Sequence, residues 1–255
     1  MLKRLLTLSI LAALLSPGDL NAIDSQRDVL TQISTIDALI SGLYDGKTPI
    51  VELKRYGDVG VGTFQGLDGE MVVLDGVIYQ VRGDGSVRIP DLTTTTPFAM
   101  VTFLDADQER VLRPGSTLSE VFQQIDAILP SKNIFQAIRI EGVFEKVTTR
   151  SVPKQSKPYP PLDKVLRAQP IFDLVNVEGV MVGFRCPPFV KGINVPGYQL
   201  QFLTKDRQAG GRVLDLTVKK ATAKIDNTPE FHLILPDDLD FYRLNLEAEN
   251  SLPQK

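Results

Sequence analysis

The sequence predicts an α+β fold that is rich in β-strands and holds few helices. Residues 59–90 alternate apolar and polar side chains, and turn dipeptides interrupt the alternation. The second half of the chain adds further strand-like runs with mostly short connections. Few stretches carry apolar residues at helical spacing. This combination is typical of mixed β-sheets that are covered by isolated helices.

The amino terminus reads as a signal peptide over residues 1–22. Lys3 and Arg4 supply positive charge, and residues 5–15 form an apolar core that is shorter than the ~20 residues of a membrane span. Ala22 offers a small residue before the cleavage point. We therefore expect an exported protein, periplasmic or extracellular, with no stable membrane span after the leader is cleaved. An uncleaved anchor is the alternative, because Leu20 is unusual at its place in the cleavage site.

The first elements after the leader are a helix and a β-hairpin. Residues 29–43 carry apolar residues at helical spacing, and Asp45 ends this helix together with the glycine after it. Residues 71–74 and 77–81 read as strands. The Asp-Gly pair at residues 75–76 predicts a tight turn between them.

The middle of the chain returns to strand, helix and strand. Residues 98–104 form a strand candidate. Thr117 and Glu120 have the spacing of a capping box and begin a helix whose apolar face runs from residue 118 to residue 129. Residues 135–149 then read as a long strand.

A segment with four prolines, residues 152–161, is predicted to be a loop or a crossing segment. A short helix is expected at residues 162–168. Strand candidates follow at residues 171–184, 198–203, 213–225 and 231–235. The proline-rich segment is the best domain boundary, which gives an N-terminal domain over residues 27–155, a C-terminal β-rich domain over residues 156–241 and a polar tail over residues 242–255. The alternative is that strands on both sides of it share one core.

Composition excludes several classes of protein. The net charge of -3 gives no electrostatic case for binding nucleic acid, which would call for a clustered basic surface. The single cysteine, Cys186, excludes an intrachain disulfide and is expected to be a small apolar filler. The single histidine, His232, excludes a Cys/His zinc cluster and is expected to be structural.

Several long motifs in a fixed order resemble the acetolactate decarboxylase family, from about residue 33 to residue 241. They read YGDVGVGTFQGLDGEMVVLDGVIYQV from Tyr56, IRIEGVFEKVTTRSVPKQSKPYPPL from Ile138 and GFRCPPFVKGINVPGY from Gly183. The resemblance implies a two-domain α/β architecture, a homodimer and a zinc site in a cleft. It also implies the family reaction, which is the decarboxylation of 2-acetolactate to acetoin.

The same resemblance implies roles for particular residues. Glu70 falls on a glutamate that lies at the family's metal site and handles protons. Arg150 falls on the arginine that holds the substrate carboxylate, and Thr63 falls on a pocket threonine. Glu247 and Glu249 are both candidates for a further glutamate near the carboxyl end.

The segment from Gly192 to Asp215 departs from the family at the zinc ligands. It reads GINVPGYQLQFLTKDRQAGGRVLD, and the three positions at which the family has zinc-binding histidines hold Gln199, Gln201 and Arg212. Amide oxygens are weak substitutes for imidazole at zinc, and a guanidinium has no free lone pair. We therefore expect no metal cofactor. Our hypothesis is that Arg212 replaces the metal's charge and pairs with Glu70, in a bidentate manner if the geometry allows.

Simpler structural interpretations compete with these roles. Gln199 and Gln201 alternate on a strand, so both point to one face, which is most often a solvated face. Glu70 and Arg150 would then be surface polar residues. The surrounding motifs favour a pocket instead, with Gln199, Gln201 and Thr63 lining it beside the catalytic candidates Glu70, Arg150 and Arg212.

Three functions remain open from the sequence. The first is an acetolactate decarboxylase that works without its usual zinc. The second is a non-catalytic protein that binds a small keto or hydroxy acid in the same cleft. The third is a structural role in the cell envelope.

Overall fold

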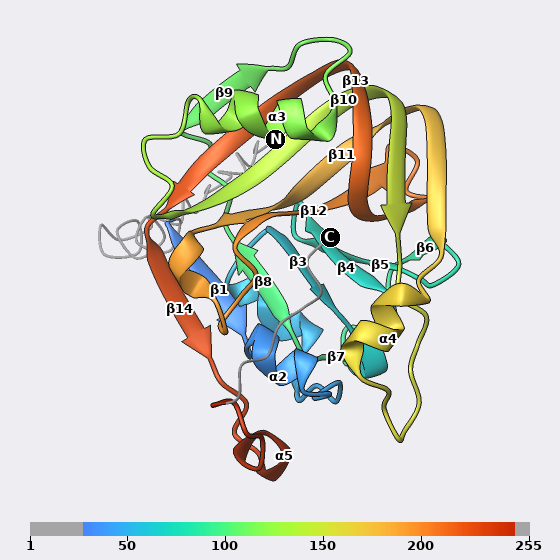
Figure 1. Cartoon of the computed structure of the whole chain (residues 1–255), viewed down its shortest axis with the longest axis vertical. Helices are drawn as coiled ribbons and strands as arrows, with labels where there is room; N and C mark the ends of the chain where they lie inside the picture. Colours follow the sequence, from blue (N-terminus) through green and yellow to red (C-terminus); the bar gives the residue numbers. More distant parts are fainter. Residues whose placement is uncertain (1–27, 248–255) are drawn as a thin grey trace, which may run out of the picture.

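The structure is a computed structural model in which residues 28–247 are described. Two sheets dominate it (Figure 1): the long strands lie in the upper half of the view and most of the shorter strands in the lower half. The predicted leader, residues 1–22, lies outside the described residues. None of the helices formed by residues 28–247 has the length and apolar character needed to span a bilayer.

The first sheet has seven strands in the order β14-β1-β8-β3-β4-β5-β6. In chain order, its strands are β1 (Val29–Ile33), β3 (Val59–Thr63), β4 (Glu70–Leu74), β5 (Val77–Val81), β6 (Val87–Arg88), β8 (Ala99–Thr102) and β14 (Glu230–Ile234). The hairpin predicted at residues 71–81 is confirmed, with Asp75 at φ 52° and Gly76 at φ 73° in its turn. A turn with two positive φ angles matches the right-handed twist of the strands on either side.

The second sheet has the order β10-β11-β12-β13-β9 and closes on itself, because β10 also pairs with β13. Its strands are β9 (Gln108–Val111), β10 (Phe135–Arg150), β11 (Ile171–Cys186), β12 (Gly197–Thr204) and β13 (Gly210–Thr228). Four strands therefore form a closed cycle. Inside the core beside it, the rings of Phe144 and Phe202 meet edge to face at 5.9 Å. The alternation of apolar residues along these strands correctly predicted most of them.

The helices are short. They are α2 (Ile36–Ile40), α3 (Leu118–Asp126), α4 (Leu162–Arg167), α5 (Leu239–Tyr242) and the 3-10 segments η1 (Ile50–Arg55), η2 (Gln65–Leu67) and η3 (Pro188–Val190). The predicted capping box of α3 is confirmed, since the Thr117 and Glu120 side chains each bond the other residue's backbone N–H. The proline-rich loop and the helix after it are also confirmed. A two-stranded pair, β2 (Thr48–Pro49) with β7 (Thr95–Thr96), completes the fold.

The helix predicted over residues 29–43 is wrong in its first half. Val29–Ile33 forms β1, which lies in the sheet between β14 and β8, and helix α2 begins only after Thr35. A strand in this place is covered on both faces, so its sequence carries no clean alternation. Thr35 caps α2 by accepting a hydrogen bond from the Ala38 N–H at 3.2 Å. Strand β9 was not predicted, because it is a short polar edge strand.

The predicted division at residues 155/156 does not coincide with the boundary between the sheets. Strand β14 pairs with β1 in the first sheet, and β10 pairs with β11 and β13 in the second. Each sheet therefore takes strands from both sides of the proline-rich segment. One cluster of buried side chains contains Leu30, Phe135 and Phe184 together.

Asp226 on β13 is a buried acid whose ionisation opposes folding. Its side chain is 0% exposed; Oδ2 accepts a hydrogen bond from the Asp105 N–H, and Oδ1 has no partner among the described residues. Burial, with a smaller contribution from the charges of Asp107, Asp28 and Asp105, raises its pKa to about 7 against the lowering effect of that hydrogen bond. A raised pKa stabilises the fold below the unfolded value of ~4, and this contribution is lost as pH rises to about 7.

We expect Asp226→Asn to be as stable as the wild type at pH 4 and more stable at pH 8, by on the order of 1–3 kcal/mol. The amide mimics the protonated carboxyl and cannot ionise. Melting temperatures measured from pH 4 to pH 9 check this. Asp215→Asn, an exposed acid on the same strand, is the control for the change in charge. Parallel pH curves for the wild type and Asp226→Asn would contradict the assignment.

Candidate functional site

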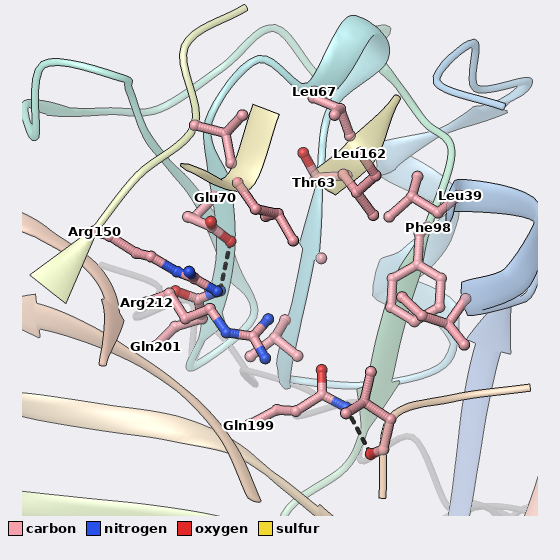
Figure 2. Close-up of a pocket in the computed structure, with 16 residues that line it drawn as sticks. Leu39, Thr63, Leu67, Glu70, Phe98, Arg150, Leu162, Gln199, Gln201 and Arg212 are labelled. Atoms are coloured by element: carbon pink, nitrogen blue, oxygen red, sulfur yellow. Dashed lines mark hydrogen bonds between the residues drawn. The ribbon is translucent and has the colours of Figure 1, made fainter. Parts of the chain in front are cut away.

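A cavity lies where the two sheets face each other, and all six predicted site residues line it (Figure 2). Glu70 and Thr63 come from the first sheet, where they are direct cross-strand partners on β4 and β3. The other four come from the second sheet. They are Arg150 on β10, Arg212 on β13, and Gln199 and Gln201 on β12. Residues from distant parts of the chain thus meet in one cavity.

Cross-strand register places the polar residues of the second sheet side by side. Arg212 is the direct partner of Arg150 on one side and of Gln201 on the other. Gln199 lies two residues before Gln201, and therefore on the same face of β12. The solvated-face interpretation of the two glutamines is wrong, because Gln199 is 6% and Gln201 is 4% exposed.

Glu70 is buried at this polar end and is held by an amide. Its Oε2 accepts a hydrogen bond from Gln201 Nε2 at 2.7 Å, drawn as a dashed line in Figure 2. Burial raises the pKa of the Glu70 carboxyl, while the charge of Arg212, the Gln201 hydrogen bond and the charge of Arg150 lower it. Burial prevails, so Glu70 keeps a proton to a higher pH than an ordinary glutamate. It can therefore serve as an acid.

Arg212 projects into the cavity near Glu70, but the bidentate pair that the hypothesis allowed is absent. Within residues 28–247, no ion pair joins Glu70 to Arg212; the two interact only through their charges. The hydrogen bond to Glu70 Oε2 comes instead from Gln201, which is the cross-strand neighbour of Arg212.

The two guanidinium groups are half-buried and lack acceptors. No hydrogen bond or ion pair with any other residue that the structure describes involves the guanidinium of Arg150 or of Arg212, and Arg150 Nε is fully buried without a partner. Burial lowers the pKa of Arg150, as does the like charge of Arg212, whereas Glu70 raises it. Both groups remain cationic, since a guanidinium is not deprotonated in proteins. They are free to hold an anion.

The remaining polar residues form a fixed wall. Gln199 Nε2 donates to Asn194 Oδ1 at 2.6 Å and to the Val195 carbonyl at 3.2 Å. Thr63 donates from its hydroxyl to the Gly69 carbonyl at 2.7 Å. Gln201 Oε1 is buried and has no donor in the described part of the chain.

The side chains present do not fit a zinc ion. The guanidinium of Arg212 has no lone pair to give, and Gln199, whose nitrogen is hydrogen-bonded to Asn194 and Val195, offers only a neutral amide oxygen, a weak substitute for imidazole at zinc. The Gln201 amide also presents its nitrogen, not its oxygen, to Glu70. No group of three or more His, Cys, Asp or Glu side chains able to hold a metal occurs within residues 28–247.

The opposite end of the cavity is apolar and was not predicted. Its wall is made chiefly by Leu39 from α2, Leu162 and Leu166 from α4, Leu67 from η2 and Phe98 just before β8. The proline-rich loop is fastened over this end, since Gln155 N–H bonds the Gly66 carbonyl at 2.7 Å and Tyr159 bonds Asp45 at 2.7 Å.

Three further residues singled out in the sequence lie outside the polar lining of the cavity. Cys186 is buried beneath Gln199, and burial raises the pKa of its thiol to about 12, so it is a filler and not a nucleophile. His232 is exposed on β14 and contacts the Tyr56 ring edge to face. Glu247 is exposed and does not line the cavity, and Glu249 lies outside the described residues.

Comparison with known proteins gives one consistent family. The family model described as alpha-acetolactate decarboxylase matches residues 30–248. A protein of Methanosarcina mazei named alpha-acetolactate decarboxylase is 49% identical over 219 residues, which cover 86% of this chain and 76% of that protein. A protein of the same name from Methylococcus capsulatus is 44% identical over 85% of each chain.

Solved structures agree in fold. The crystal structure of alpha-acetolactate decarboxylase from Bacillus subtilis strain 168 has a TM-score of 0.84 at 39% identity, and the match covers 86% of this chain and 94% of that one. A Staphylococcus aureus protein, described as similar to alpha-acetolactate decarboxylase but of unknown function, has a TM-score of 0.81 at 30% identity and covers 88% and 94%.

Proposed function

This chain belongs to the alpha-acetolactate decarboxylase family, and we propose that its cavity binds 2-acetolactate and decarboxylates it to acetoin without a zinc ion. The observation that carries the proposal is the pair of guanidinium groups without acceptors beside the buried acid Glu70. Together they offer an anion site, a fixed positive charge and a proton donor at one end of a single cavity.

The reaction moves negative charge from the substrate carboxylate to the ketone oxygen, where it must be stabilised. The bond between the carboxylate carbon and carbon 2 breaks, and its electron pair forms a double bond between carbon 2 and the ketone carbon. The ketone oxygen takes the negative charge of the resulting enediolate. Carbon dioxide leaves, and a proton added to carbon 2 completes acetoin. A positive group aimed at the ketone oxygen lowers the barrier because the charge develops there in the transition state.

We assign Arg150 to the carboxylate, Arg212 to the developing enediolate oxygen and Glu70 to the proton. A planar guanidinium binds a carboxylate through two parallel hydrogen bonds. That contact favours the substrate ground state, so acceleration must come from Arg212 and Glu70, whose interactions strengthen as the reaction proceeds. Thr63, Gln199 and Gln201 shape the polar wall, and the apolar end takes the methyl groups.

An acetoin assay with and without a chelator tests this proposal. We expect turnover that a chelator leaves unchanged, and we expect Arg212→Met to lower kcat by about 100-fold or more, as for loss of one oxyanion donor. Arg110→Gln, an exposed arginine on β9, is the control. Stoichiometric zinc with turnover that a chelator abolishes would refute the proposal.

The second candidate is a binding protein that retains the cavity and has lost turnover. The observation that favours it is the poor fit of the residue set to zinc at the three positions Gln199, Gln201 and Arg212. A rise in melting temperature on addition of a small keto or hydroxy acid, without acetoin formation, would identify this case.

We also propose that the protein is exported, on the strength of the charged and apolar pattern of residues 1–22. A mature chain that begins at Ile23, identified by its intact mass in the exported fraction, tests the proposal.

A further inference from the structure

Arg150 and Arg212 form a like-charged pair in an unusual position. They lie directly opposite each other on β10 and β13, and both side chains enter the same cavity. Like charges directly opposite on antiparallel strands are destabilising. Half-burial makes the repulsion stronger, because less water screens it.

The cavity does not relieve this repulsion by direct contact. Glu70 is the single acidic side chain among the described residues that line it, and its Oε2 is hydrogen-bonded to the neutral amide of Gln201. The cavity therefore carries a net charge of +1 when Glu70 is ionised and +2 when it is protonated. Because burial raises the pKa of Glu70, the doubly positive state extends to higher pH than for an exposed acid.

A simple monocarboxylate such as propionate, which has no oxygen besides those of its carboxylate, leaves one guanidinium unused. A single carboxylate fills the fork of one arginine, and the other fork keeps its donors without acceptors. The rest of the ligand must then extend toward the apolar end formed by Leu39, Phe98 and Leu162. A second carboxylate is excluded from that end by its desolvation cost, so both charges of a dianion must lie at the polar end.

We infer that the cavity binds short dicarboxylates, of three or four carbons, in preference to monocarboxylates of equal length, with one carboxylate on Arg150 and the other on Arg212. The inference rests on the proposed function, because it names the wider class of acids that the same cavity accepts. It assigns Arg212 a role in selecting ligands. Short dicarboxylates are then competing ligands for acetolactate.

Titration calorimetry at constant ionic strength tests the inference. Malonate and succinate are compared with propionate and butyrate on the wild type, on Arg212→Gln and on the control Arg110→Gln. We expect the dicarboxylates to bind at least ~10-fold more tightly to the wild type and to Arg110→Gln, in line with one added charge-assisted pair. Arg212→Gln should bind both kinds of acid with equal affinity. Melting curves verify that each variant folds, and Arg150→Gln replaces Arg212→Gln if the latter does not.

Equal affinities on the wild type would overturn the inference, and so would a preference that survives in Arg212→Gln. If the protein turns over acetolactate but binds malonate no more tightly than propionate, the inference fails and the proposed function stands. If no acid binds, both fail.

Discussion

Glu70→Gln is expected to lower kcat for acetoin formation by about 100- to 10,000-fold, the usual effect of losing a general acid. The variant keeps an oxygen that can accept the Gln201 hydrogen bond, which is 2.7 Å long in the wild type. It removes only the proton that must reach carbon 2. Single-turnover measurements of acetoin release check this expectation.

The same variant should bind acids at least as tightly as the wild type. Glu70 is the one acidic side chain of the described cavity lining, so its removal leaves the charges of Arg150 and Arg212 unopposed. A loss of turnover with unchanged or stronger binding separates a proton donor from a structural residue. Retained turnover in Glu70→Gln would show that the proton comes from elsewhere.

The pH dependence of the wild type supplies a second check on Glu70. Burial raises the pKa of the carboxyl, so its acid form is complete at low pH and is lost as pH rises through the raised value. We expect kcat to fall as pH rises over the range in which Glu70 loses its proton. This fall in kcat should be absent from the residual activity of Glu70→Gln.

Gly183→Ala is expected to destabilise the fold by about 3 kcal/mol, as overpacking does between well-packed strands. An added Cβ at Gly183 would lie 1.9 Å from the Gln199 carbonyl oxygen and 3.0 Å from the Leu200 Cα. Both contacts are backbone atoms of β12, which pairs with β11 at this point. The two strands must therefore move apart.

The displacement should also weaken acid binding, because β12 carries Gln199 and Gln201 into the cavity. Thermal unfolding and titration with propionate measure the two effects. The control is Gly115→Ala, whose added Cβ meets nothing within 4 Å and whose cost is limited to that of a positive φ, about 1 kcal/mol. Equal stability of the two variants would contradict the predicted clash.

At the three positions where the family resemblance implies imidazoles, this chain has the amides of Gln199 and Gln201 and the guanidinium of Arg212. The positive charge at position 212 is covalently attached and depends on no metal supply. A guanidinium spreads its charge over a planar fork, so each hydrogen bond stabilises an enediolate less than a divalent cation would. This predicts a slower reaction, and it is why a binding protein is the alternative to an enzyme.

Local sequence correctly predicted the elements that depend on interactions between residues close together in the chain. The hairpin at Asp75 depends on two residues with positive φ, and the start of α3 depends on the reciprocal bonds of Thr117 and Glu120. For strand β1, the prediction from local sequence was wrong. Its residues are apolar enough for either element, and only pairing with β14 and β8 makes them a strand.

By itself, the sequence determined the family, the β-rich α+β class and six polar residues that line the cavity, because long motifs and residue identities do not depend on how the chain folds in space. Tertiary structure decided which of those residues touch. It placed Arg212 between Arg150 and Gln201, and it gave the Glu70 hydrogen bond to the amide and not to the guanidinium. It also supplied the apolar end of the cavity. These features depend on strand register and on the packing of one sheet against the other, which bring together residues more than a hundred positions apart and leave no signal at any one of them.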